Sequence, residues 1–242
     1  MDTLLIILNT PFLGKEAWLW LSFMGIVAAL LAFDLGVLHK DDHVIEVKES
    51  LLLSGFYITM ALLFGAWVWW YLGADSGMKY LTGFMIEKSL SMDNVFVISM
   101  IFAYFAVPRI YQHRVLFWGI FGALALRAVF IVLGSALISQ FWWLLLVFGA
   151  FLVYTGAKII RHRDDEGEKE STRGLGLLRR VMPVSDKLDG QKFFTVLNGK
   201  RAATPLLAAL VVIEVTDVIF AVDSVPAILA VSNESFIVFA SN

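Results

Sequence analysis

The sequence predicts an all-α, polytopic membrane protein, and three observations carry that prediction. Hydrophobic residues make up 59% of the 242 residues and charged residues only 17%, whereas an ordinary soluble domain is about half apolar and about a quarter charged. The mean hydropathy is +0.78. At least six apolar stretches are each long enough, at roughly 20 residues, to cross a bilayer as a helix. The chain therefore needs lipid as part of its solvent.

The predicted spanning helices begin near residue 17 and end near residue 231. The third and sixth stretches are the longest and carry the most polar residues. A further apolar run at residues 235–242 is expected to begin another spanning segment, so that the chain would stop before further helices. The six stretches lie near Ala17–Leu38, Leu51–Leu72, Tyr80–Val107, Val115–Ile138, Phe141–Ile160 and Ala202–Val231.

Lys and Arg are distributed unevenly between the two sides of the predicted membrane. Counted on alternate sides of the helices, fourteen fall on one side and two, Lys15 and Lys79, on the other. Because short cytoplasmic loops retain Lys and Arg, we expect the N-terminus outside and the charged loop at residues 161–201 in the cytoplasm of a multi-pass inner (plasma) membrane protein. The net charge of −2 offers no basic surface for a nucleic acid.

The loop at residues 161–201 carries two local structure signals. Asn198-Gly199 lies between two short runs and is typical of a type I′ turn in a β-hairpin, with an irregular loop as the alternative. The run from Gly174 to Val181 fits a short helix at the membrane interface, with the same alternative.

A short internal repeat relates the third stretch to the sixth. Asp93–Ser99 aligns with Asp217–Asp223, which pairs acid with acid and Phe96 with Phe220. Three spans separate the two copies, and an odd number reverses the direction across the membrane. We therefore expect a 3+3 inverted repeat within a single transmembrane domain at residues 1–242. The first repeat would cover about residues 16–107 and the second about residues 115–232.

Five carboxylates lie well inside the third and sixth stretches. Each costs about 2.5 kcal/mol or more at the centre of a membrane helix. A sequence retains several of them when they meet a cation, a proton or one another. The five are Glu87, Asp93, Glu214, Asp217 and Asp223.

Helical spacing predicts which polar side chains of the third stretch share a face. Glu87, Ser91 and Asn94 fall at i, i+4 and i+7 and form one oxygen-bearing stripe. Ser89 and Asp93 form an adjacent stripe.

The sixth stretch presents its acids on two faces. Glu214 and Asp217 share a face, whereas Asp223 lies half a turn away from Glu214 at about 100° per residue. Bringing Asp223 to the other two requires a break in the helix. Pro226 is the candidate for that break because it removes a backbone hydrogen bond.

The donors available in these stretches are hard oxygens from carboxylates, the Asn94 amide, hydroxyl groups and backbone carbonyls. Such donors suit Mg²⁺, Ca²⁺ or Mn²⁺, whereas Zn²⁺ and copper favour imidazole and sulfur. The chain has no Cys, and its four His fall outside the apolar stretches. Five acids exceed the need of one divalent ion, so we expect some to titrate and to couple metal release to proton uptake.

Two long motifs stand out, EKSLSMDNVFV at Glu87–Val97 and EVTDVIFAVDSVPA at Glu214–Ala227. In this order they resemble the paired signature of the TerC (tellurium resistance, Alx-type) family of integral membrane proteins. That family is similar to the lysine-exporter-like superfamily of cation and amino-acid exporters. The likeness covers most of the chain from about residue 50 onward.

The resemblance implies manganese efflux or manganese homeostasis and, from the family's name, tellurite-type stress resistance. We expect a transporter rather than an enzyme, with no permanently bound cofactor, that moves Mn²⁺ or a similar divalent ion outward against protons. Its partners would be that ion and the lipid bilayer, and assembly into a homo-oligomer stays open. Carried over by motif, the metal site comprises Glu87, Asp93, Asn94, Glu214, Asp217 and Asp223.

Two basic residues are candidate charge partners of these acids. Arg127 has no acid near it in the fourth stretch and is expected to pair with an acid from another helix. Lys88 faces about 100° away from Glu87, which suits a snorkelling side chain as well as a functional one. Ion pairs alone could join the helices without any transport, but two bases cannot neutralise five acids.

Two other functions stay open. A membrane scaffold or metal-delivery component of a resistance complex would depend on the loop at residues 161–201 and would show no ion flux of its own. An intramembrane hydrolase with an Asp pair has less support, because no nucleophilic or water-activating arrangement accompanies the acids.

Overall fold

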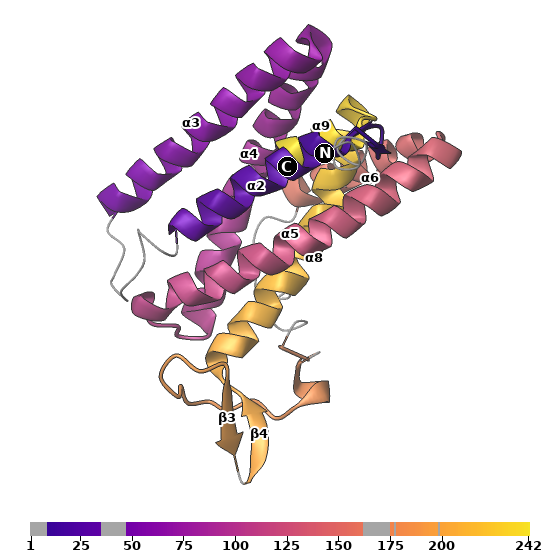
Figure 1. The fold of residues 1–242 in the computed structure, drawn as a ribbon. Coiled ribbons are helices and arrows are strands. Elements are labelled where there is room, and N and C mark those ends of the chain that lie inside the picture. The colour runs from indigo at the N-terminus through magenta and orange to yellow at the C-terminus, as the bar shows by residue number, and fades with distance from the viewer. Residues whose placement is uncertain (1–8, 35–46, 162–174, 177, 198) are drawn as a thin grey trace. The chain divides into compact units, whose positions relative to one another are not determined.

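The computed structural model describes residues 9–34, 47–161, 175–176, 178–197 and 199–242, without the side chains at positions 152, 155, 156, 158–161 and 223. Most of these residues are helical (Figure 1). The chain forms two compact units. The first comprises Met1–Met85 and Val231–Asn242, and the second comprises Ile86–Ala230.

Each of the six predicted apolar stretches contains a long helix. Three of the helices in the described part of the chain, α3, α5 and α8, are both long and apolar enough to cross a membrane. Helix α2 is shorter, with 17 residues, and α4 carries the charged motif that lowers its hydropathy. Six spans therefore stay a prediction. The helices are α2 (Ala17–Phe33), α3 (Val47–Leu72), α4 (Ala74–Tyr104), α5 (Arg109–Gln140), α6 (Leu144–Arg161), α8 (Pro205–Val231) and α9 (Ser235–Ser241).

The first unit packs aromatic side chains from α2, α3, α4 and α9. Its core contains Leu19, Val68, Tyr80, Phe236 and Ile237, all at most 2% exposed. The buried Tyr80 hydroxyl donates a hydrogen bond to the carbonyl of Ala61 on α3 at 3.0 Å, which satisfies its polar end. A small hairpin of β1 (Pro11–Phe12) and β2 (Lys15–Glu16) leads into α2.

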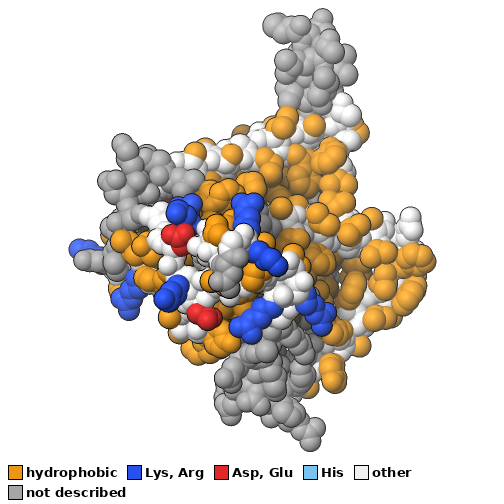
Figure 2. All heavy atoms as spheres, turned by 90° about the horizontal axis from the view of Figure 1, so that it is seen from below, with side chains coloured by type: hydrophobic (Ala, Val, Ile, Leu, Met, Phe, Trp, Pro, Cys, Tyr) orange, Lys and Arg blue, Asp and Glu red, His pale blue; other side chains and the backbone are white. Residues whose placement is uncertain are grey.

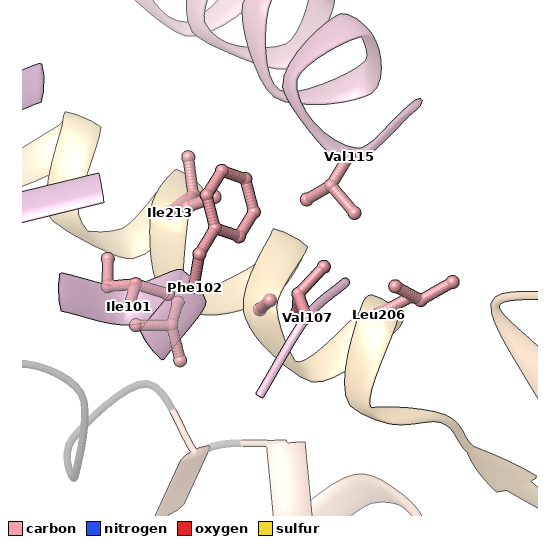
Figure 3. Packing of buried hydrophobic residues seen from close by; sticks show 8 residues of the cluster. Ile101, Phe102, Val107, Val115, Leu206 and Ile213 are labelled. Atoms are coloured by element: carbon pink, nitrogen blue, oxygen red, sulfur yellow. The ribbon is translucent and has the colours of Figure 1, made fainter. Parts of the chain in front are cut away.

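The second unit is built on three helices whose directions follow from their contacts. Gly119 of α5 faces Ile213 of α8, and Gly134 of α5 faces Leu229 of α8, so these two helices run in the same direction. Helix α4 runs opposite to them, since its end packs against the beginnings of α5 and α8. That cluster, shown in Figure 3, comprises Ile101, Phe102, Val107, Val115, Leu206, Ala209, Val212 and Ile213.

The predicted β-hairpin is confirmed. Strands β3 (Phe194–Leu197) and β4 (Lys200–Ala203) pair antiparallel, with Leu197 opposite Lys200 across the two-residue connection. Gly199 has φ +75°, a conformation that glycine adopts without strain. Asn198 lies outside the described residues, as does Gly174. The predicted short helix is confirmed at residues 175–176 and 178–181.

Helix α8 does not break at Pro226, so that expectation was wrong. The helix continues through Pro226 to Val231, and Pro226 is buried within it. A proline removes one backbone donor, and neighbouring helices can compensate for that loss in a membrane protein. The continuous helix keeps Asp223 on a different face from Glu214, and the side chain of Asp223 lies outside the described residues.

The surface of the helices is largely apolar. Trp70, Met92 and Trp142 are among the exposed large hydrophobic side chains, at 81%, 71% and 72%. So many large exposed apolar side chains indicate a nonpolar surrounding. Figure 2 shows broad hydrophobic areas beside Lys and Arg side chains gathered near the hairpin end of the second unit. The exposed basic residues of that end include Arg179, Arg180, Lys187, Lys192, Lys200 and Arg201.

Candidate functional site

Arg127 ties together acids from two different helices of the second unit. Its guanidinium on α5 donates hydrogen bonds to Glu87 on α4 and to Asp217 on α8, where Nη2 lies 3.0 Å from Oδ1. The three side chains are only 13%, 9% and 14% exposed. The expectation that Arg127 pairs with an acid from another helix is therefore confirmed, and it pairs with two.

These ionic groups lie far from the ends of their helices. Asp217 is about 18 Å along α8 from Pro205, and Arg127 is about 27 Å along α5 from Arg109, at 1.5 Å per residue. Helix α8 is the most buried of the three long apolar helices, and Asp217 on it is only 14% exposed. The sequence places charge at membrane depth, and the fold encloses that charge.

Glu214 packs against the bare backbone of α5 at Gly122. A Cβ atom built on Gly122 would lie 2.6 Å from Glu214 Oε2 and closer still to Oε1, so any larger residue would displace the carboxylate. Glu214 lies one helical turn before Asp217 on α8. Glycine at position 122 thus allows a second carboxylate of α8 to reach the α5 surface near Arg127.

Three buried oxygens along α8 have no hydrogen-bond partner among the described residues. They are Glu214 Oε2, Asp217 Oδ2 and Ser224 Oγ. Ser224 is 3% exposed and follows Asp217 by seven residues, which places both on one face of the helix. A buried polar atom without a partner costs roughly 1–3 kcal/mol. The two carboxylate oxygens, Glu214 Oε2 and Asp217 Oδ2, therefore lie where a cation, a proton or water would be stabilised.

Two other predicted ligands are less buried than Glu87 and Asp217: Asp93 is exposed and Asn94 is half-buried. The candidate charge partner Lys88 is also exposed. Within the described part of the chain, no group of three or more acidic or histidine side chains is close enough to hold a metal ion. The structure brings together Glu87, Arg127 and Asp217, and it places Glu214 against Gly122.

Sequence reasoning missed Gly122 and the role of its neighbour Gly119. The signal was present as two small residues near each other in an apolar stretch, since glycine lets membrane helices approach closely. Gly119 contacts Ile213 and Leu210 of α8, one turn before Gly122. Gly122 thus leaves room for the Glu214 carboxylate, which the spacing of the acids along α8 does not reveal.

The ionisable side chains around α8 carry more negative than positive charge. When all are ionised, the carboxylates of Glu87, Glu214 and Asp217 and the guanidinium of Arg127 carry a formal charge of −2 together. Crowded carboxylates in a water-poor place either bind positive charge or take up protons. This excess of negative charge favours the uptake of positive charge, as protons or as a cation.

The chain is similar to membrane proteins of several bacteria. It is 50% identical over 232 residues to an uncharacterized membrane protein, STKORF319, of Myxococcus xanthus, covering 96% of this chain and 72% of that protein. An uncharacterized membrane protein of Rickettsia bellii is 44% identical over 223 residues, 92% of this chain and 74% of its own length. No solved structure matches the chain.

A named relative and a family model give the same assignment. The proposed membrane-bound redox modulator Alx of Escherichia coli K12 is 44% identical over 236 residues, covering 93% of this chain and 73% of its own length. The model of the integral membrane protein TerC family matches residues 72–242, which include both motifs and the Arg127 site. The chain belongs to the TerC family of integral membrane proteins.

Proposed function

We propose that this protein moves a divalent cation, Mn²⁺ by preference, across the membrane, from the cytoplasm outward and in exchange for protons. The observation that carries the proposal is the pair of buried carboxylate oxygens on α8, Glu214 Oε2 and Asp217 Oδ2, that have no hydrogen-bond partner among the described residues. Carboxylates in such a place are stabilised by a visiting positive charge.

The chemistry of the site favours a hard divalent ion. Its donors are carboxylate and hydroxyl oxygens, which suit Mn²⁺, Mg²⁺ and Ca²⁺. The 242 residues contain no Cys, so a thiol of this stretch cannot carry out redox chemistry. The name of the relative Alx, a redox modulator, is compatible with the movement of a redox-active metal ion such as manganese.

Flux through the purified full-length protein tests the proposal. Liposomes containing the wild type are expected to take up Mn²⁺ saturably, with an initial rate that depends on a pH gradient. Asp217→Asn and Glu214→Gln each remove one negative ligand and are expected to lower the rate at least about tenfold, the equivalent of about 1.4 kcal/mol. Asp75→Asn is the matched control, because Asp75 is an exposed acid at the start of α4.

Two outcomes would contradict the proposal. If both neutral variants transport Mn²⁺ at the wild-type rate, the acids of α8 are not the site. If the wild type shows no saturable flux of any divalent ion, transport is wrong and the scaffold alternative takes its place.

A further inference from the structure

Arg127 occupies the same carboxylates that a transported cation would need. Its guanidinium binds Asp217 Oδ1 at 3.0 Å and also donates to Glu87. Both acids are among the predicted metal ligands. A guanidinium at Oδ1 reduces the negative charge that Asp217 offers to a cation at Oδ2, and two positive charges so close together repel each other. Cation and guanidinium therefore compete for Asp217.

The competition takes place in a largely buried site, where water screens the charges only weakly. The side chains of Arg127 and Asp217 are 13% and 14% exposed, so their attraction is screened much less than that of a surface pair. A cation that approaches Asp217 is repelled by the guanidinium, and displacing the guanidinium from Asp217 removes that repulsion. Conversely, the returning guanidinium replaces the cation's charge without leaving a bare carboxylate.

Glu87 provides a place for the displaced guanidinium. It lies on α4, opposite Asp217 on α8, and already accepts a hydrogen bond from Arg127. An arginine has five donors in a planar fork, so it can keep one partner while it releases another. The guanidinium can thus leave Asp217 while its charge stays paired.

We propose that Arg127 is a tethered competitor of the transported cation: it holds Asp217 when the site is empty, is displaced when the cation binds, and drives release when it returns. The inference rests on the proposed function and adds the mechanism of release. Because the tie to Asp217 joins α5 to α8, its opening also converts cation binding into a change in the contact between these two helices.

Direct binding measurements on the purified full-length protein test the proposal separately from flux. Arg127→Gln removes the competitor and is expected to lower the Kd for Mn²⁺ at least about tenfold, a coupling of ordinary size. The maximal flux is expected to fall, since tighter binding slows release. A residue that only staples helices would give weaker or unchanged binding. Arg109→Gln removes a charge from the exposed start of the same helix and is expected to leave the Kd unchanged.

Arg127→Lys keeps the test decisive if Arg127→Gln does not fold. Lysine keeps the charge but cannot bridge two carboxylates as a planar fork, so a reduction of the Kd by about threefold is expected. Saturable Mn²⁺ binding by the wild type with unchanged or weaker binding by the variants overturns this inference alone. Absence of Mn²⁺ binding by the wild type overturns the proposed function and this inference with it.

Discussion

Gly122 determines how close the Glu214 carboxylate comes to α5. In Gly122→Ala the new methyl group would occupy the space of the carboxylate, which is the flexible end of its side chain and can turn away. We therefore expect a folded protein whose thermal midpoint is nearly unchanged but whose Mn²⁺ flux is reduced about tenfold, the equivalent of about 1.4 kcal/mol. Flux in liposomes and thermal unfolding in detergent measure the two effects.

Gly119→Ala is the matched control for this prediction. A Cβ atom at Gly119 would lie 3.4 Å from Ile213 Cγ2, an ordinary contact on the same face of the same helix. It is expected to retain the flux. Equal losses in both variants would indicate that α5 and α8 need two glycines for packing, and that the position of Glu214 is not what matters.

For single residues, the sequence predicted which side chains share a helix face better than it predicted which side chains form ion pairs. Glu87 is buried while Ser91 and Asn94 are half-buried, and Ser89 and Asp93 of the adjacent stripe are exposed, as the helical period requires. Arg127 was recognised as a charge partner, but its two acids lie 40 and 90 residues away. Only tertiary packing determines such a pairing, because spacing along one helix cannot reveal it.

The turn from α3 to α4 depends on a close approach at Gly77. A Cβ atom there would lie 2.7 Å from Trp69 Cα, a backbone atom that cannot move independently of α3. Gly77→Ala is expected to destabilise the first unit by about 1–3 kcal/mol, the usual cost of overpacking. The shift of the thermal midpoint in detergent measures this effect.

The control for Gly77→Ala lies on α3 itself. Gly55 has open space around its Cα, so Gly55→Ala is expected to leave the thermal midpoint unchanged or to raise it slightly. If Gly77→Ala is as stable as Gly55→Ala, the contact with Trp69 is looser in solution than in the structure.

Elements with strong local signals were predicted, and elements determined by context were not. The dipeptide Asn198-Gly199 indicated the β3–β4 hairpin because glycine permits the turn. The β1–β2 hairpin was not predicted, since two-residue strands show no alternation and its turn places Leu13 at φ +49° beside Gly14 at φ +81°. Pro226 signalled a break, yet packing around a buried proline keeps α8 continuous.

For the whole molecule, the directions of α4, α5 and α8 agree with the prediction that successive helices cross the membrane in opposite directions. Helices α5 and α8 run in the same direction, so the chain between them has to return to the side where α5 began. Helix α6 is about 27 Å long, nearly the thickness of a bilayer core, and suits that return. The inverted repeat itself stays a prediction, because a match of seven residues does not establish a symmetry axis between the two halves.

The orientation in the membrane is the last prediction, and the lack of Cys makes it directly measurable. Asn9→Cys and Lys200→Cys place single exposed thiols before α2 and in the β3–β4 hairpin. With the N-terminus outside, a membrane-impermeant maleimide is expected to label Asn9→Cys in intact cells and Lys200→Cys only after permeabilisation, in full-length protein without other thiols. The bias of Lys and Arg toward the hairpin side is the physical reason. Labelling of Lys200→Cys in intact cells would reverse the proposed direction of transport, because the site would then be loaded from the opposite side.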